Sequence, residues 1–240
     1  MAVTRAAVPF PVVPGKTIDD VRAIARRFEG DPEGWAESRR RLGVTLERAY
    51  FQETPMGSFV IAYLETTRPI EEVLTAPAHS DLEIDRWFVD HVRDVHGVDL
   101  REMQQAPPLE NVGEWIDPDV STTKRGFAFC APMLPDMVDE GRAWAAETFR
   151  SEGMTESRRR FGQTKEIVTL VQTPNGPVTG VYLEGDDPVD ANARFVASQE
   201  QFDVDFRAML HRLYPPFINF DQPVPGITEF FDSSRLPVSA

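Results

Sequence analysis

The sequence contains one pattern twice, at an offset of 119 residues. The segment 37–65 aligns without a gap on the segment 156–184, and 14 of the 29 aligned positions are identical. Unrelated segments of ordinary composition would share about two. A repeat of this length indicates a duplicated domain rather than a solenoid. We therefore expect a first domain at 1–118, a linker at 119–124 and a second domain at 125–232.

Each copy shows the same order of expected elements. Short apolar runs at 8–13 and 126–131 indicate first strands, and helical spacing follows at 18–28 and 137–149. A further helix should begin at Asp31-Pro32 and end at Gly43. Strands at 45–54 and 58–65 flank a turn, and helices at 81–96 and 191–213 precede a last short strand in each copy. The order β-α-β-β-α-β predicts an α+β fold of two ferredoxin-like units.

One face of such a sheet is left bare by its own helices and needs a partner. A tandem copy supplies that partner within one chain. The segments 14–17 (PGKT), 80–81 (SD) and 84–85 (ID) resemble a small uncharacterised branch of the dimeric α+β barrel superfamily. The resemblance implies two ferredoxin-like units packed sheet to sheet as an intrachain barrel. That superfamily includes cofactor-free oxygenases, polyketide cyclases, isomerases, haem enzymes and ligand sensors, so it implies a small-molecule pocket but no particular reaction.

Composition excludes several partner classes. Asp and Glu outnumber Lys and Arg by 39 to 25, which gives a net charge of −14 and argues against nucleic acid and anionic membranes. No apolar run approaches the roughly 20 residues that cross a bilayer. Prolines interrupt the N-terminal segment, so we expect no export signal, and the single Cys130 fits a reducing cytoplasm. We expect Cys130 to be a core residue.

The turn at 55–57 (PMG) suits a three-residue hairpin loop, in which Glu53 pairs with Phe59. In that register Arg48, Tyr50 and Gln52 share one sheet face with aliphatic residues of the next strand, and we expect this face to lie under the helices. The second copy has Ile, Thr and Val at the three equivalent positions, 167, 169 and 171. Because these three positions are more polar in the first copy than in the second, we predict a pocket in the first copy. The second copy would then have a structural role as its packing partner.

The helix at 81–96 adds two candidates to this site. His91 lies at helical spacing from apolar residues and should point at the sheet, with Trp87 one position off that stripe. Arg48 would bind an acidic oxygen or an enolate, and Tyr50 and His91 would exchange protons. Gln52 and Trp87 would orient and stack the ligand. The competing interpretation is that Arg48 extends to the pocket rim and His91 is a satisfied core histidine.

The leading hypothesis is a cyclase, isomerase or cofactor-free oxygenase that acts on an aromatic or polyketide-like metabolite. No nucleotide cofactor is expected, because the segment 15–17 (GKT) lacks the upstream glycine of a phosphate-binding loop. We expect no metal site. The alternatives are a non-catalytic module that binds a small molecule or a partner, and a haem protein with His91 as axial ligand. The chain could be a monomer or a higher oligomer.

Two features recur in both copies. Glu47 beside Glu65, and Glu166 beside Glu184, are expected to be cross-strand carboxylate pairs at strand ends. Such pairs could raise one carboxyl pKa or hold a divalent metal, but salt-bridged strand ends are the favoured interpretation. The triple arginines at 39–41 and 158–160 are expected to form solvated helix ends.

Overall fold

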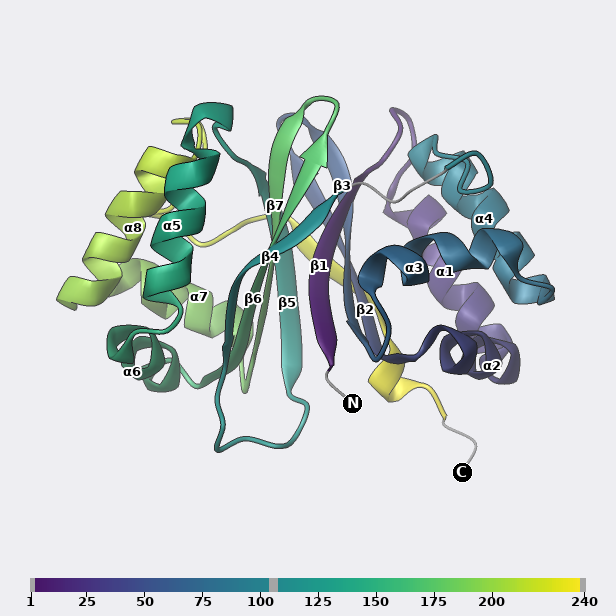
Figure 1. Cartoon of the computed structure of the whole chain (residues 1–240), viewed down its shortest axis with the longest axis horizontal. Coiled ribbons are helices and arrows are strands. Elements are labelled where there is room, and N and C mark those ends of the chain that lie inside the picture. The colour runs from purple at the N-terminus through teal and green to yellow at the C-terminus, as the bar shows by residue number, and fades with distance from the viewer. Residues whose placement is uncertain (1–2, 104–107, 238–240) are drawn as a thin grey trace. The chain divides into compact units, whose positions relative to one another are not determined.

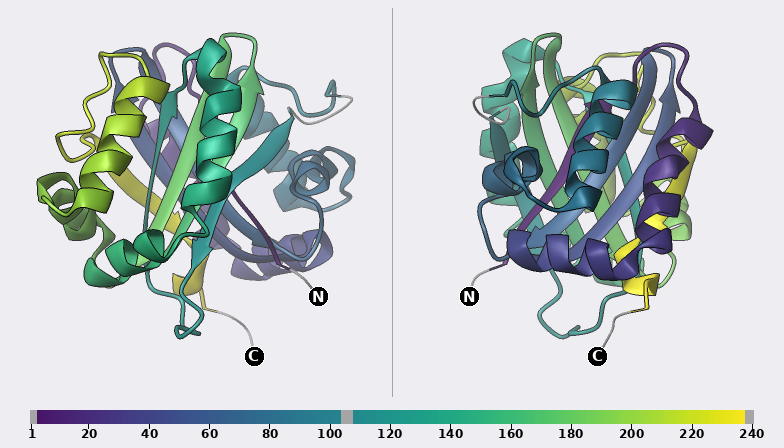
Figure 2. Two further views of the ribbon diagram at one scale, coloured as in Figure 1. Left: turned by 60° about the vertical axis from the view of Figure 1, so that its left-hand side comes forward. Right: turned by 90° about the vertical axis from the view of Figure 1, so that its right-hand side faces the viewer.

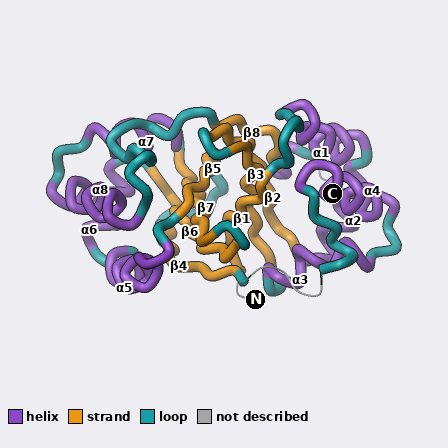
Figure 3. The backbone as a smooth tube through the Cα atoms, turned by 90° about the horizontal axis from the view of Figure 1, so that it is seen from above, coloured by secondary structure: helices purple, strands orange, loops and turns teal. Residues whose placement is uncertain are grey.

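The computed structural model describes residues 3–103 and 108–237. It divides into two compact units, residues 1–109 with 226–240, and residues 110–225. Each unit has a four-stranded sheet whose helices lie on one side of it (Figures 1 and 3). The expected α+β class with ferredoxin-like units is confirmed. Among the described residues, no helix is long and apolar enough to cross a membrane.

The first unit holds the sheet β1-β3-β2-β8. Its strands are β1 (Thr4–Pro11), β2 (Val44–Thr54), β3 (Gly57–Thr66) and β8 (Ile227–Asp232), and neighbouring strands are antiparallel. The helices are α1 (Ile18–Gly30), α2 (Pro32–Leu42), the short α3 (Ile70–Thr75) and α4 (Glu83–His96), and α1, α2 and α4 lie across one face of the sheet (Figure 2, right).

The second unit holds the sheet β4-β6-β7-β5. Its strands are β4 (Leu109–Ile116), β5 (Arg125–Pro132), β6 (Gln163–Thr173) and β7 (Gly176–Gly185). The helices are α5 (Val138–Thr148), α6 (Glu152–Arg160), α7 (Pro188–Ala197) and α8 (Gln201–Leu213) (Figure 2, left). The described part of the chain also contains short 3-10 turns at Ala76–His79, Pro135–Met137 and Ser233–Arg235.

The compact units differ from the sequence copies at 1–118 and 125–232, because each copy gives its last strand to the other unit. Strand β4 ends the first copy but joins the second sheet beside β6, and β8 ends the second copy but pairs with β2. Just after β4, the backbone N–H of Asp117 donates to the carbonyl of Thr164 at 2.9 Å, which extends the pairing of β4 with β6 by one hydrogen bond. The last strand of each copy can pair with the same sheet edge in either unit. The repeat in the sequence therefore does not show which of the two sheets each last strand joins.

Local signals explain the helix boundaries. The side chain of Asp31 caps α2 by accepting a hydrogen bond from the backbone of Gly34, Pro32 occupies the first turn, and Gly43 ends the helix with a left-handed φ of 71°. The single helix expected at 191–213 is wrong, because the chain becomes extended at Ser198. The backbone N–H of Glu200 donates to the Ser198 hydroxyl at 3.3 Å, a local hydrogen bond that competes with helix continuation.

The β2–β3 hairpin differs from its expected register by one residue. Thr54 pairs directly with Gly57, so the turn contains two residues rather than three, and Gly57 has a φ of 123°. A one-residue shift moves every side chain of one strand to the other face relative to its partner. Arg48 therefore lies opposite Tyr63, and the helix side of β2 carries Glu47, Ala49 and Phe51, with Phe51 packing beside Val60.

Candidate functional site

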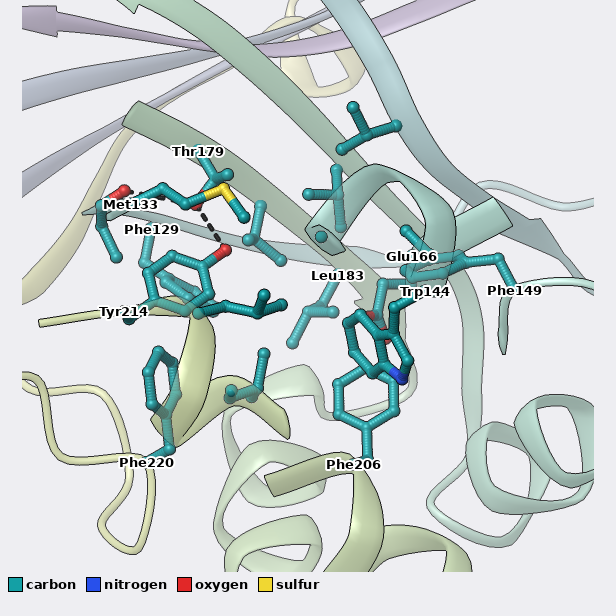
Figure 4. A pocket seen from close by; sticks show the side chains of 18 of the residues that line it. Phe129, Met133, Trp144, Phe149, Glu166, Thr179, Leu183, Phe206, Tyr214 and Phe220 are labelled. Carbon is teal, nitrogen blue, oxygen red and sulfur yellow. Dashed lines mark hydrogen bonds between the residues drawn. The ribbon is translucent and has the colours of Figure 1, made fainter. Parts of the chain in front are cut away.

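A cavity of about 100 Å³ lies in the second unit, between the sheet and helices α5, α7 and α8 (Figure 4). Its walls are mainly apolar and include Phe129, Trp144, Phe149, Leu183, Phe206 and Phe220. An apolar cavity of roughly 150 Å³ holds a benzene molecule, so this space has about two thirds of that volume and could hold at most one small aromatic ring. The expectation of a filled second copy is therefore wrong, and the pocket expected in the first copy stays a prediction.

Neighbouring strands and the segment after α8 build this space. Alternate residues of β6 and β7 face the helices, and Val168 and Val181 form part of the floor. Trp144 from α5 and Phe206 from α8 pack edge to face at 4.7 Å between ring centroids. The proline-rich segment 214–226 adds Tyr214 and Phe220.

A buried ion pair occupies the cavity end near α6. The Nε of Arg158 donates to Oε2 of Glu166 at 2.5 Å, and the two side chains are only 4% and 7% exposed. The Nη1 of Arg158 donates to the Ser157 hydroxyl at 3.0 Å, and that hydroxyl donates to the side chain of Asp203 at 2.5 Å. The guanidinium also stacks over the ring of Phe206 at 4.7 Å. These contacts compensate charges that would be costly to bury alone.

Two hydroxyl groups mark the other end of the cavity. Those of Thr179 and Tyr214 are 2.8 Å apart (Figure 4), and the Thr179 hydroxyl donates to the carbonyl of Ala131 at 3.2 Å. Burial raises the pKa of the Tyr214 hydroxyl to about 12, because the phenolate would lose its hydration. Tyr214 therefore stays protonated throughout the neutral range.

The first unit contains the same polar cluster at equivalent positions. Arg39 binds Glu47 through two hydrogen bonds, from Nε to Oε2 at 2.7 Å and from Nη2 to Oε1 at 3.1 Å. Its Nη1 also donates to Ser38, whose hydroxyl donates to Asp85 at 2.6 Å. Trp35 adds a third hydrogen bond to Glu47. Sequence reasoning missed the role of this cluster, although the serine, arginine and glutamate recur identically in both copies.

The carboxylate pairs expected from the hairpin are separated by the true register. Glu47 lies on the helix side with Arg39, whereas Glu65 accepts a hydrogen bond from Tyr63 at 2.7 Å. In the second unit Glu184 likewise accepts from Tyr182 at 2.8 Å and pairs with Lys165 at 3.2 Å. Salt-bridged carboxylates are confirmed, but the side-by-side pairs are wrong.

The arginine runs also differ from expectation at their first positions. Arg39 and Arg158 are buried, with exposed fractions of 4% and 3%, and only the later arginines of each run reach the surface. The hydroxyl and carboxylate partners of each buried arginine come from the preceding serine and from the next strand, as described above.

The structure divides the five candidate residues into two groups. Arg48, Tyr50 and Gln52 are buried on the sheet face that points away from the unit's helices, so their expected position under the helices is wrong. The one-residue shift of the hairpin is the cause. Arg48 lies 3.2 Å from the carboxylate of Asp232 on β8.

Trp87 and His91 form the second group, on α4 above the opposite face of the same sheet. Their rings stack in parallel, with centroids 4.9 Å apart and an interplanar angle of 9°. Burial lowers the pKa of His91, with smaller contributions from Asp94 and Asp20 that raise it. The structure therefore brings Trp87 and His91 together but does not join them to Arg48, and the catalytic roles assigned to these residues stay predictions.

Neither cysteine nor metal chemistry gains support from the geometry. Burial raises the pKa of Cys130 to about 12, which keeps its thiol protonated and unreactive, as expected for a core position. Within residues 3–103 and 108–237, no group of three His, Cys, Asp or Glu side chains could hold a metal ion.

Comparisons with known proteins identify the fold. The sequence matches no family model and no curated protein. A protein of Fusobacterium nucleatum subsp. nucleatum, provisionally named a monooxygenase, has a similar structure at a TM-score of 0.50 and 10% identity, over 95% of this chain and 89% of that one. An anthrone oxidase-like protein matches at a TM-score of 0.48 and 9% identity, over 95% and 88% of the two chains. At such identity the first likeness supports the two-unit α+β fold.

Proposed function

We propose that this protein is an oxygenase-type enzyme that binds a small aromatic compound in the cavity of its second unit. The observation that carries the proposal is a ring-sized apolar space with aromatic walls and one buried ion pair, Arg158–Glu166, at its end. Concave, mainly apolar sites with few convergent polar groups are typical of small-molecule binding. The structurally similar protein that is provisionally named a monooxygenase favours oxygenase chemistry.

The walls favour an aromatic compound over an aliphatic one. Trp144 and Phe206 already pack edge to face, and a planar ring could extend this arrangement in the same geometry. The walls are mainly apolar, and Arg158 and Glu166 are themselves buried, so their charges act on a bound compound at a lower local dielectric than in water. No nucleotide cofactor is part of this proposal.

A non-catalytic binding module is the second candidate, and one observation favours it. The Tyr214 hydroxyl has a pKa of about 12 and is hydrogen-bonded to Thr179, so it is poorly suited to exchange protons at neutral pH. A site that only binds would need no titrating group. Recovery of a bound compound chemically unchanged under air would select this candidate.

Cavity filling tests the proposal. Val181 lines the cavity, and Val181→Phe adds a ring to the space that the ligand would occupy. Val189→Phe is the matched control, because Val189 belongs to the same unit and is 54% exposed. Toluene binding, measured by calorimetry, should persist in the control and be lost in Val181→Phe. Equal toluene binding by both variants, with both still folded, would place the ligand elsewhere and end the proposal.

Catalysis requires a separate measurement. Hydroxylated aromatic compounds that bind the wild-type protein should be incubated under air, with oxygen uptake and products followed by an oxygen electrode and mass spectrometry. Oxygen uptake that is lost in Val181→Phe and kept in Val189→Phe supports the enzyme. Binding without oxygen uptake or any product favours the non-catalytic module.

A further inference from the structure

We propose that the cavity recognises an uncharged aromatic compound through a hydroxyl group that donates a hydrogen bond to Oε1 of Glu166. This inference rests on the proposed function, because it names the class of compound that the same cavity takes. The same buried cluster occurs in both units, and its carboxylate is bound differently in each.

In the first unit the carboxylate is fully engaged. Arg39 donates to both oxygens of Glu47, at 2.7 and 3.1 Å, and Trp35 donates to Oε2 at 3.4 Å. A carboxylate held in this way has little capacity left for a ligand, and its role is to compensate the buried arginine.

In the second unit the equivalent carboxylate is only half engaged. Arg158 donates to Oε2 of Glu166 through Nε alone. None of the described residues donates a hydrogen bond to Oε1 of Glu166. The position equivalent to Trp35 holds Met154, which has no N–H group to donate. Glu166 is 5% exposed and lines the cavity beside Leu183 and Trp144 (Figure 4). Oε1 therefore remains open toward the cavity as an acceptor, and a ligand hydroxyl could donate a hydrogen bond to it.

The other end of the cavity also presents an acceptor. The Thr179 hydroxyl gives its proton to the carbonyl of Ala131, so the Tyr214 hydroxyl gives its own proton to Thr179. Only the lone pairs of the Tyr214 oxygen then remain for a ligand. Both ends of the space therefore favour a compound that carries donors over one that carries only carbonyl or ether oxygens.

The charges of Glu166 and Arg158 restrict the class of ligand further. A carboxylate or phosphate ligand would be repelled by Glu166, and a cationic ligand would be repelled by the adjacent Arg158 guanidinium. A neutral hydroxyl suits both, because it can donate to the carboxylate and accept from the guanidinium. Phenols combine this group with the planar ring that the walls favour.

Three probes of similar size test the inference: phenol, toluene and anisole, which has the ether oxygen but no donor. Their dissociation constants should be measured by calorimetry with the wild-type protein, Glu166→Gln and Glu47→Gln. Wild-type protein should bind phenol at least about tenfold more tightly than toluene or anisole, because a hydrogen bond to a charged group outweighs the one lost to water.

Comparing Glu166→Gln with Glu47→Gln shows which carboxylate is responsible for the preference for phenol. Arg158 only donates, so the amide oxygen in Glu166→Gln should remain at the Oε2 position and its NH₂ should face the cavity, replacing an acceptor with a donor. Phenol preference should then fall below about threefold while toluene affinity is retained. The same change at Glu47, in the other copy of the cluster, should leave all three affinities unchanged.

Each outcome decides between the two proposals. A phenol preference that is absent from the wild-type protein, or that survives in Glu166→Gln, overturns the inference but leaves the aromatic cavity in place. If no probe binds the wild-type protein, the proposed function fails as well. Should Glu166→Gln fail to fold, the comparison of phenol with anisole in the wild-type protein still decides, because only phenol can donate.

Discussion

Trp35 and Glu47 are joined by a hydrogen bond of 3.4 Å from the indole Nε1 to Oε2, which completes a buried polar cluster in the first unit. Ser38, Arg39 and Asp85 form the rest of this cluster, and the guanidinium of Arg39 lies 4.7 Å above the ring of Phe28. Because Arg39 and Glu47 compensate each other inside the protein, removing either one leaves a buried charge.

We expect Arg39→Leu to destabilise the protein by about 3–5 kcal/mol, the usual cost of breaking a buried ion pair from one side. Arg40→Leu is the matched control, because Arg40 is the next residue and its side chain is 72% exposed. The control should change the free energy of unfolding by about 0.5 kcal/mol or less. Denaturant unfolding followed by circular dichroism measures both, and equal effects would contradict a structural role for the cluster.

The buried histidine of the first unit makes stability depend on pH. Desolvation lowers the pKa of His96 to about 4, and the hydrogen bond from its Nδ1 to the carbonyl of Pro11, at 2.8 Å, offsets this only partly. As the pH falls below about 6.5, His96 binds a proton in the unfolded chain but stays neutral in the folded chain. The free energy of unfolding should therefore fall by about 3 kcal/mol between pH 6.5 and 4 from this group alone.

His96→Asn tests this dependence, because asparagine can keep the hydrogen bond to Pro11 and does not titrate. Its stability should fall less steeply over the same pH range than that of the wild-type protein. The exposed His79 provides the control, and His79→Asn should leave the wild-type slope unchanged. Identical slopes for all three proteins would show that His96 is not the titrating group.

Haem binding through His91 can be tested by absorption spectroscopy. The Nε2 of His91 is enclosed without a hydrogen-bond partner among the described residues, and one face of its ring is covered by Trp87. An iron outside the protein cannot reach a nitrogen in that position unless α4 moves. We therefore expect added haem to give no protein-bound Soret band. A band that disappears in His91→Ala would instead support the haem hypothesis.

The elements were predictable because their signals are local. Asp31, Pro32 and Gly43 bound α2 through capping and backbone geometry, which depend only on neighbouring residues. The sequence repeat was equally clear, since nearly half of the positions in 37–65 recur in 156–184, and it predicts a duplicated domain. These features gave the fold class and the approximate bounds of the helices and strands.

The candidate site was not predictable from the same signals. The residues 55–57 (PMG) suit turns of two or three residues. Assuming a three-residue turn shifts the register by one residue, and this placed Arg48 and Tyr50 on the helix side of the predicted sheet. The polar contrast between the copies was therefore assigned to the wrong face. On the true helix side, the informative difference is Trp35 against Met154, two apolar residues that a polarity scale does not separate.

Fragments of the chain would distinguish the compact units from the sequence copies. Residues 108–225 contain all four strands of the second sheet, whereas residues 125–232 lack β4 and carry β8 without its partner β2. Losing β4 exposes the edge of β6 and removes Trp115, which packs with Phe149 and is buried. An unpaired strand edge favours aggregation, and removal of a large core side chain costs about 3–5 kcal/mol.

We therefore expect the fragment 108–225 to unfold cooperatively and at higher denaturant concentration than 125–232, which should be poorly folded or aggregated. Circular dichroism and size-exclusion chromatography measure this, and toluene binding reports whether the cavity has formed. Because the cavity is lined by residues 112–224 alone, the first fragment should keep it. If 125–232 is the better-folded fragment, the exchange of β4 and β8 between the units is wrong and each copy completes its own sheet.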